Sequence, residues 1–567
     1  MNFFNKAHII AHIIRWRLTW NNKDLSYKHP KVKGEKFITA REFALMIKDG
    51  MTVSTVGMAG NHRCSVFFWA IKELFLNNGS PKNLTWIALG AQGTREKAPG
   101  SLDELAIPGI ITKIISGHYN TLTGIPRLAE AGQIEMHVIP LGIGAMVLEE
   151  QAKGNDYLIT DTGLNTFVDP QVGTGSYVAG SPQTSSYVKR VGDKLKYHLP
   201  AIEIAMFVAP YADAEGNIYF TNGCTYTEAR ETTFATRAKG GKVVVSVTAI
   251  IPKNEKEIFL KSEYVDYIII HPYNEQTGMV LQRRYWKMLL KGGNENIDVS
   301  VSKLKFMNAF IKVTPTRVPA EDVIARAAAW LFMKLIKKGE HINIGTGLPE
   351  EVSRMIYEGG IYKDVTFFTE TGVIGGLPAP GSFFGTAINP EDIITSAQMF
   401  HRLYENRNLT TVLGMIEADS NGNINVSRRG ARPSLYVGLG GFTDITSAAR
   451  NIIFVGSWMA HAQFSVANGK MSITKKGENK FVEKVSEVSF NGSEGLRKEQ
   501  NVYYVTNVGI FKLTQKGMCL IYVMPGIDIE KDILKDCQMK IVFPENQDVK
   551  NIPLEVFNGK DFKLKWD

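Results

Sequence analysis

One short pattern occurs twice in this chain, and it constrains the fold more than any other feature. Residues 213–218 are DAEGNI and residues 419–424 are DSNGNI, and each follows an apolar, β-branched run, at residues 204–209 and 412–416. Asp, Asn and Gly in this arrangement are typical of tight turns that follow strands. The recurrence indicates that the chain contains two related units.

A second repeat lies near the start of each unit. Residues 39–50 combine a capping-box pattern with the apolar stripe of a helix, and a strand-like run with a glycine turn follows at residues 51–60. The same order returns as a helical face at residues 324–335 and a strand and glycine turn at residues 340–347. Apolar runs that alternate with helical patterns predict parallel sheets covered by helices. We therefore predict an α/β fold of two related, doubly wound, mostly parallel domains.

The length of 567 residues is too great for a single hydrophobic core. We expect an N-terminal extension at residues 1–37, a first domain at residues 38–290, and a second domain at residues 319–567. Residues 291–318 are predicted to form a linker, because a polar stretch rich in Gly and Asn opens this segment.

The composition narrows the class of function. Apolar residues make up 44% of the chain and charged residues 21%, which is ordinary for a globular protein. The net charge of +9 is not concentrated in a basic stripe with interleaved aromatics, so nucleic-acid binding is not predicted, whereas a polyanionic small molecule suits it. Neither the cysteines nor the histidines have metal-ligand spacing, and no run is apolar for long enough to span a membrane. We predict no metal, no disulfide and no membrane span; the cysteines are Cys64, Cys224, Cys519 and Cys537.

The first residues of the chain allow two interpretations. Residues 1–23 contain no acidic residue, have isoleucines at helical spacing and carry Lys6, Arg15 and Arg17. We favour an appended helix that packs on the body or on a partner subunit, in a cytoplasmic protein. The alternative is a targeting segment, with a mitochondrial or membrane-surface location.

A lone carboxylate, Glu370, lies in a glycine-rich and otherwise apolar turn, FFTETGVIGGLPA at residues 367–379. A carboxylate with little water and no cation nearby in sequence has a raised free energy and is a better nucleophile. Glu370 also closes the apolar run at residues 365–368, and ligands of open α/β sheets bind at the carboxyl ends of strands. We predict that Glu370 carries the chemistry; a structural role as a helix cap is the alternative.

Residues 369–379 resemble the nucleophile segment of family I coenzyme A transferases, of the fused-subunit acetate or propionate CoA-transferase type. The likeness runs from about residue 38 to 545, and further matching segments lie at residues 163–170, 422–427, 438–445 and 525–528. It implies an acyl-CoA:carboxylate CoA-transferase that acts on acyl-CoA and short-chain carboxylates. It also implies that no cofactor is permanently bound and that the enzyme is a homodimer or homotetramer.

The resemblance further implies a ping-pong mechanism. Glu370 would form an acyl-glutamyl anhydride and then a glutamyl-CoA thioester, so neither ATP nor a metal would be needed. The backbone N–H of Gly441 and the side-chain amide of Asn425 would stabilise the oxyanions, and Gly438 and Gly440 would belong to the CoA-binding turn. From the residues alone, the glycines also fit a tight turn, and Asn425 also fits a turn residue that bonds its own backbone.

Three places depart from the family pattern and bear on the acyl preference. They are residues 57–63, residues 457–462 and Asn507. The bulk of Trp458 and Met459 either narrows the acyl pocket or fills core space, which is the commoner use of such residues.

Other candidates follow from the same comparison with the family. Gln92 lies in a segment similar to the family's and is expected to line the acyl pocket, whereas His62 and His461 are interpreted as packing or hydrogen-bonding residues. An acyl-CoA hydrolase or a lyase-associated acyl transferase subunit is the enzymatic alternative, because the same intermediate can pass to water or to a carrier thiol. A sensor that binds CoA esters is the non-enzymatic alternative.

Overall fold

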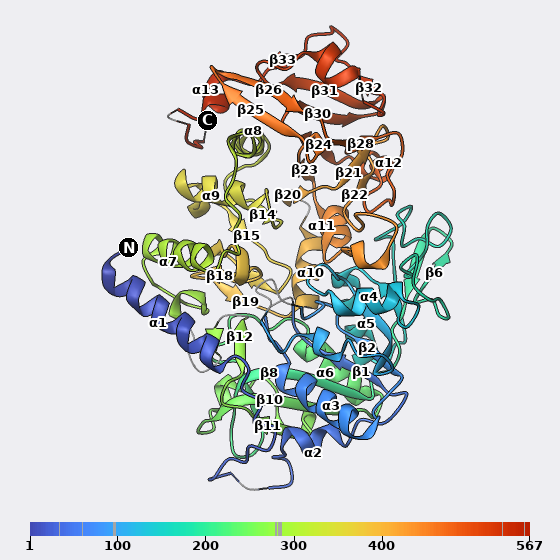
Figure 1. The fold of residues 1–567 in the computed structure, drawn as a ribbon, viewed down its shortest axis with the longest axis vertical. Helices are drawn as coiled ribbons and strands as arrows, with labels where there is room; N and C mark the ends of the chain where they lie inside the picture. Colours follow the sequence, from blue (N-terminus) through green and yellow to red (C-terminus); the bar gives the residue numbers. More distant parts are fainter. Residues whose placement is uncertain are drawn as a thin grey trace.

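The chain forms two large sheets, one in each half of the sequence, and Figure 1 shows the two halves one above the other. The computed structural model describes residues 1–32, 34–58, 61–93, 98–277, 280–281, 286–406, 408–535, 537–560 and 562–566.

The sheet of the N-terminal half has the strand order β11-β10-β8-β1-β2-β3-β4, and every neighbouring pair in this order is parallel. Its strands are β1 (Thr52–Thr55), β2 (Leu84–Ile87), β3 (Ile111–Ser116), β4 (Glu135–Val138), β8 (Ile204–Ala212), β10 (Lys242–Ile250) and β11 (Tyr267–Ile270), with β9 (Ile218–Tyr219) antiparallel to β8. Its helices are α2 (Ala40–Ala44), α3 (Ser65–Asn78), α4 (Gly124–Glu130), α5 (Leu141–Ala152) and α6 (Ala229–Ala238).

The sheet of the C-terminal half has the order β15-β14-β20-β23-β29-β30-β31-β32. It is parallel from β15 to β29 and antiparallel from β29 to β31. The strands are β14 (His341–Ile344), β15 (Thr366–Phe367), β20 (Thr410–Gly414), β23 (Asn451–Val455), β29 (Asn501–Val505), β30 (Gly509–Thr514), β31 (Gly517–Val523), β32 (Ile541–Val542) and β33 (Lys550–Asn551). The helices are α8 (Pro319–Leu335), α9 (Glu350–Glu358), α10 (Ser396–Glu405), α11 (Phe442–Ala448), α12 (Gly492–Arg497) and α13 (Leu554–Asn558). The predicted α/β class with mostly parallel sheets is confirmed.

Short strands outside the two sheets form small hairpins and ribbons. They are β5 (Leu158–Thr160), β6 (Val188–Val191), β7 (Lys194–Tyr197), β12 (Glu275–Thr277), β13 (Val280–Leu281), β16 (Val373–Ile374), β17 (Leu377–Pro378), β18 (Ala387–Ile388), β19 (Asp392–Ile393), β21 (Glu417–Asp419), β22 (Ile424–Asn425), β24 (Met459–Ala460), β25 (Gln463–Ala467), β26 (Lys470–Lys475), β27 (Glu478–Asn479) and β28 (Phe481–Val482).

The repeated Asp-Gly-Asn pattern folds into the same turn in both halves. The carboxylate of Asp213 accepts hydrogen bonds from the backbone N–H of Asn217 at 2.9 Å and from its side-chain amide at 2.8 Å. Asp419 accepts the same pair of bonds from Asn423, at 3.1 Å and 3.0 Å. A short carboxylate that bonds the backbone of its own turn explains why Asp occurs at this position twice.

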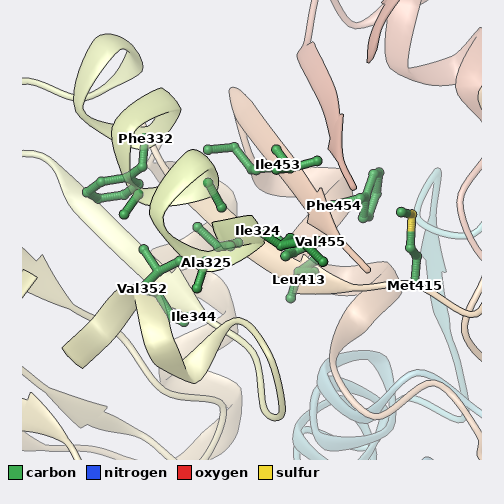
Figure 2. Close-up of a cluster of buried hydrophobic side chains, with 14 of the residues drawn as sticks. Ile324, Ala325, Phe332, Ile344, Val352, Leu413, Met415, Ile453, Phe454 and Val455 are labelled. Carbon is green, nitrogen blue, oxygen red and sulfur yellow. The ribbon is translucent and has the colours of Figure 1, made fainter. Parts of the chain in front are cut away.

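The core of the C-terminal half lies between α8 and the central strands (Figure 2). Ile324 and Phe332 of α8 lie beside Ile453 and Val455 of β23, and all four belong to one buried cluster. Phe454 points to the other face of the strand, where its ring lies 5.9 Å from that of Phe442. This packing fixes the positions of the strand ends that lead into the turns of the sheet.

Two helices lie where the sequence suggested an extension and a linker. α7 (Ile297–Phe310) begins after Asn296, whose side chain accepts the N–H of Val299. α1 (Phe3–Thr19) packs on the body through Ile9, Ile13 and Trp16, which share a buried cluster with α7. The segment at residues 291–318 therefore contains a packed helix as well as polar loops. In the part of the chain that the structure describes, no helix is both long and apolar enough to span a membrane.

We expect Ile453→Ala to lower the free energy of unfolding of the protein by about 2–5 kcal/mol, because it removes buried atoms and leaves a cavity. Ile453 is fully buried. The matched control is Leu554→Ala, at an exposed position where the change should stay within about 0.5 kcal/mol. Urea unfolding followed by circular dichroism measures both, and equal losses would contradict the packing described.

Candidate active site

Glu370 lies in a tight turn directly after β15, at the carboxyl end of this strand. The turn is closed by hydrogen bonds from the N–H of Thr369 to the carbonyl of Val373 and from the N–H of Gly372 to the carbonyl of Thr369. Gly372 has a φ of 96°, and a Cβ there would lie 1.9 Å from the carbonyl oxygen of Ile394. Glycine is therefore required to hold Glu370 in this turn.

The Glu370 carboxylate has no ion-pair or hydrogen-bond partner among the residues that the structure describes. Its backbone carbonyl accepts a bond of 3.3 Å from the Ser396 hydroxyl, but no helix N–H bonds its side chain. Burial in these surroundings raises the pKa of the carboxyl to about 7. The environment is thus the poorly solvated one that the sequence indicated, and no helix cap is seen.

A cavity of about 300 Å³ opens beside Glu370. Apolar groups make up most of its wall, including Leu304 of α7, Tyr357 of α9, Phe368 and Leu377. A cavity of this size and character can enclose part of a small organic ligand. The site of Glu370 is therefore open to a substrate and lined mostly by apolar groups.

The contribution of α7 to this cavity was not predicted. Leu304 and Asn308 of this helix line the wall, and the Asn308 side chain also donates to the carbonyl of Pro380 at 3.0 Å. A signal was present in the sequence, because Ile297, Val301 and Leu304 recur at helical spacing. The polar stretch before them obscured this pattern.

Gly441 lies against Glu370. A Cβ built on Gly441 would lie 3.0 Å from Cγ and 3.1 Å from Oε1 of Glu370, so a side chain at this position would press on the carboxylate. Within the described part of the chain, no acceptor bonds the Gly441 N–H. The structure therefore brings together two of the residues that the family resemblance had singled out.

Gly438 and Gly440 anchor the same turn to the N-terminal half of the chain. The N–H of Gly440 donates to the carbonyl of Gly117 at 2.7 Å, and its carbonyl accepts the N–H of Leu141 at 2.9 Å. Gly438 has a φ of 84°, and a Cβ there would lie 2.7 Å from the Gly117 carbonyl oxygen. Gly438 permits the close approach of two backbones, whereas Gly440 has open space around it and a φ of 55°, which favours glycine. Their predicted part in CoA binding stays a prediction.

Asn425 is buried, and its side-chain amide is already hydrogen-bonded. The nitrogen lies 2.9 Å from Oε2 of Glu417, from the carbonyl oxygen of Arg428 and from Oγ of Ser486. Its oxygen accepts the N–H groups of Ser427 and Arg428. To stabilise an oxyanion, this amide would have to give up one of these acceptors, so its role stays a prediction.

A second buried carboxylate, Asp444, was missed. It accepts the N–H groups of Gly142 at 3.1 Å and Ile143 at 3.0 Å, in the first turn of α5, and the Tyr404 hydroxyl at 3.1 Å. Burial raises the pKa of Asp444 to about 7, and the nearby charge of Glu370 adds to the effect. Asp444 lies in the segment at residues 438–445 that matches the family, but the sequence does not predict its contacts with α5 and Tyr404.

Gln92 and His62 are both buried, and each forms a hydrogen bond within the N-terminal half. The Gln92 amide donates to the carbonyl of Val56, whereas His62 Nε2 lies 2.8 Å from the Thr225 hydroxyl. Burial lowers the pKa of His62 to about 4, so this imidazole is neutral at pH 7. His461 is exposed. Two residues of the divergent glycine turn, 59 and 60, lie outside the described residues.

Trp458 fills core space. Its ring stacks on Phe481 at 4.5 Å and on Phe511 at 5.5 Å between centroids, and it is fully buried. Asn507 holds this segment, because its Oδ1 accepts the N–H of Trp458 at 2.8 Å. Neither Trp458 nor Met459 is among the residues that line the cavity beside Glu370.

Comparisons with known proteins identify the family. No family model matches the chain. Caffeate CoA-transferase of Acetobacterium woodii is 32% identical over 545 residues, which are 94% of this chain and 98% of that protein. Acetate CoA-transferase YdiF of Escherichia coli is 27% identical over 518 residues, 89% of this chain and 93% of that protein.

A solved structure supports the same fold. Acyl-CoA transferase YdiF of Escherichia coli, in a thioester complex with CoA, has a TM-score of 0.78 at 24% identity and covers 92% of this chain and 96% of its own. The chain belongs to the family I coenzyme A transferases. It is an enzyme of the acetate CoA-transferase type, and CoA thioesters are the substrates of this family.

The raised pKa of Glu370 predicts a pH-dependent effect of Glu370→Gln on stability. Because the folded pKa of about 7 lies above the ordinary value of 4.5, ionisation of Glu370 destabilises the fold as the pH rises through this range. We expect the variant to equal the wild type near about pH 4 and to exceed its free energy of unfolding by about 3 kcal/mol above about pH 8.

Urea unfolding at several pH values measures this difference. The control is Glu263→Gln, at an exposed position, for which no such trend is expected. A difference between Glu370→Gln and the wild type that does not grow with pH would show that the carboxylate is well solvated.

Proposed function

We propose that this enzyme moves CoA between carboxylic acids by a ping-pong mechanism with Glu370 as the nucleophile. The desolvated carboxylate of Glu370, which has no partner among the described residues and lies at the wall of a mostly apolar cavity, carries this proposal. In the first step, a Glu370 oxygen bonds to the carbonyl carbon of the thioester, and the C–S bond breaks. CoA thiolate is released, and an acyl-glutamyl anhydride remains on the enzyme. The thiolate then attacks the glutamyl carbonyl, and the acyl group leaves as a carboxylate.

The resulting glutamyl-CoA thioester passes its CoA to the second acid by the same steps in reverse. The incoming carboxylate attacks the glutamyl carbonyl and releases CoA thiolate, which gives a new acyl-glutamyl anhydride. The thiolate then attacks the acyl carbon of this anhydride. The new acyl-CoA is formed and the Glu370 carboxylate is restored. Overall, one CoA thioester is exchanged for another, so no ATP is consumed. The YdiF relative has been solved as a thioester complex with CoA, which supports such an intermediate in the family.

The backbone N–H of Gly441 is the proposed donor to the oxyanions. It has no acceptor among the described residues, and it lies on a residue whose Cα is close to the Glu370 carboxylate. A fixed donor in a dry site stabilises developing negative charge strongly. Asn425 is the proposed second donor, after release of one of its three present acceptors.

We propose short-chain carboxylates such as acetate, propionate and butyrate as the acids, and a homodimer or homotetramer as the assembly. The acetate CoA-transferase relative supports the acids, and the family resemblance supports the assembly. The relative named for caffeate is more similar in sequence, so caffeate belongs in the same panel of acceptors. Release of free CoA without a new CoA ester would instead indicate the hydrolase alternative.

Covalent trapping tests the nucleophile. After incubation with acetyl-CoA, treatment with hydroxylamine or borohydride should modify Glu370, and mass spectrometry of the peptides would locate the modification. Glu370→Gln should show no modification and should lower CoA exchange by at least about 10³-fold, because the covalent step is lost. A melting curve of the variant controls for folding. Modification at another residue would refute the assignment.

Gly441→Ala tests the closeness of Gly441 to Glu370. The backbone φ of Gly441 is −89°, which alanine adopts freely, whereas the new Cβ would press on Glu370. We expect kcat to fall by about 10²-fold through displacement of the carboxylate, with the fold retained. The matched control is Gly414→Ala in β20, where a Cβ meets nothing within 4 Å. Equal kcat values for the two variants would show that Gly441 is not part of the active site.

A further inference from the structure

The helix α1 has an apolar face that the rest of the chain does not cover. Phe3 is 78% exposed, Phe4 79% and Leu18 81%, while Ile14 is 53% exposed. At 3.6 residues per turn, the exposed apolar side chains share an arc of roughly 100° on one side of the helix. This outer face comprises Phe3, Phe4, Ala7, Ala11, Ile14 and Leu18.

The opposite side of α1 fixes the helix to the protein. Ile9, Ile13 and Trp16 are buried, and the ring of His12 meets that of Trp286 edge to face at 5.6 Å between centroids. The helix start is capped by Asn2, whose side chain accepts the N–H of Asn5 at 2.9 Å. Figure 1 shows α1 at the edge of the molecule beside α7. The outer face is therefore held in place and directed away from the body.

Basic residues border the outer face on both sides. By helical position, Lys6 and Arg17 follow one border, and Arg15 and His8 follow the other. Residues 1–23 contain no acidic residue. None of the ion pairs among the described residues involves Lys6, Arg15 or Arg17.

We propose that the outer face of α1 docks on an anionic lipid bilayer, lying in the plane of the membrane surface. An apolar stripe with large aromatic and aliphatic side chains enters the boundary of the acyl chains, while flanking cations meet the lipid phosphates. A second copy of the chain fits less well, because pairing of two such faces would bring their basic borders together. The positive charge at the borders of the outer face therefore favours an anionic bilayer over a second copy of the chain.

Vesicle co-sedimentation of the full-length protein tests the proposal. One set of vesicles contains phosphatidylcholine alone, and the other contains phosphatidylglycerol as about a third of the lipid. We expect the protein to bind the anionic vesicles at least about 10-fold more tightly than the neutral ones, and to dissociate at high salt. Absence of binding, or equal binding to both vesicle types, would overturn the proposal.

Two variants show whether the outer face is responsible. Leu18→Glu should weaken binding to anionic vesicles by about 10-fold or more, because it places a charge in the apolar stripe. The matched control is Leu76→Glu at the end of α3, where the leucine is 63% exposed, and its binding should equal that of the wild type. Lys6→Gln combined with Arg15→Gln should abolish the preference for anionic lipid.

The same samples test whether the outer face instead binds a second copy of the chain. Circular dichroism and melting curves of Leu18→Glu should match those of the wild type, and light scattering should give both the same molar mass. A smaller mass for Leu18→Glu would assign the outer face to contact between copies of this chain and would overturn membrane docking. Loss of vesicle binding by Leu76→Glu as strongly as by Leu18→Glu would do so as well.

Discussion

Desolvation of the Glu370 carboxylate, which has no ion-pair partner among the described residues, is the constraint on which the rest of this site depends. A half-buried, unpaired carboxylate raises the free energy of the folded state when it is ionised, and its pKa of about 7 reflects that cost. The large buried clusters of both halves offset it. The turn that carries Glu370 depends on glycine, because a Cβ on Gly372 would lie 1.9 Å from the Ile394 carbonyl oxygen.

The two halves of the chain complete the site together. Gly117 in the N-terminal half accepts the N–H groups of Leu439 and Gly440, and Asp444 accepts those of Gly142 and Ile143. These bonds fix the turn that brings Gly441 against Glu370. Each half contains a large sheet, but the geometry of the site comes from contacts between the halves that the sequence repeat does not encode.

This division explains which features the sequence could predict. The sequence predicts the apolar surroundings of Glu370 and the glycine turns because their signals are local: a carboxylate among apolar residues, and glycines between strands and helices. The roles of these residues stay predictions. The sequence predicts a linker at residues 291–318, because the polar residues before Ile297 outweigh the short helical pattern of what the structure shows as α7. Asp444 gave no local signal of its role, since its partners Gly142 and Ile143 are some 300 positions away in the chain. The packing of Trp458 between Phe481 and Phe511 likewise depends on tertiary contacts.

Buried carboxylates near the contact between the halves point to a common property of this region. Burial raises the pKa of Glu228 to about 8 and of Glu231 to about 7, and Glu231 accepts the hydroxyl of Thr395, next to the residue whose hydroxyl bonds the Glu370 carbonyl. Burial desolvates these groups, which is costly for each carboxylate when it is ionised. In the proposed mechanism, the same desolvation would protect an anhydride or thioester from hydrolysis, so the cost of burying Glu370 and a preference for transfer over hydrolysis would have one physical cause.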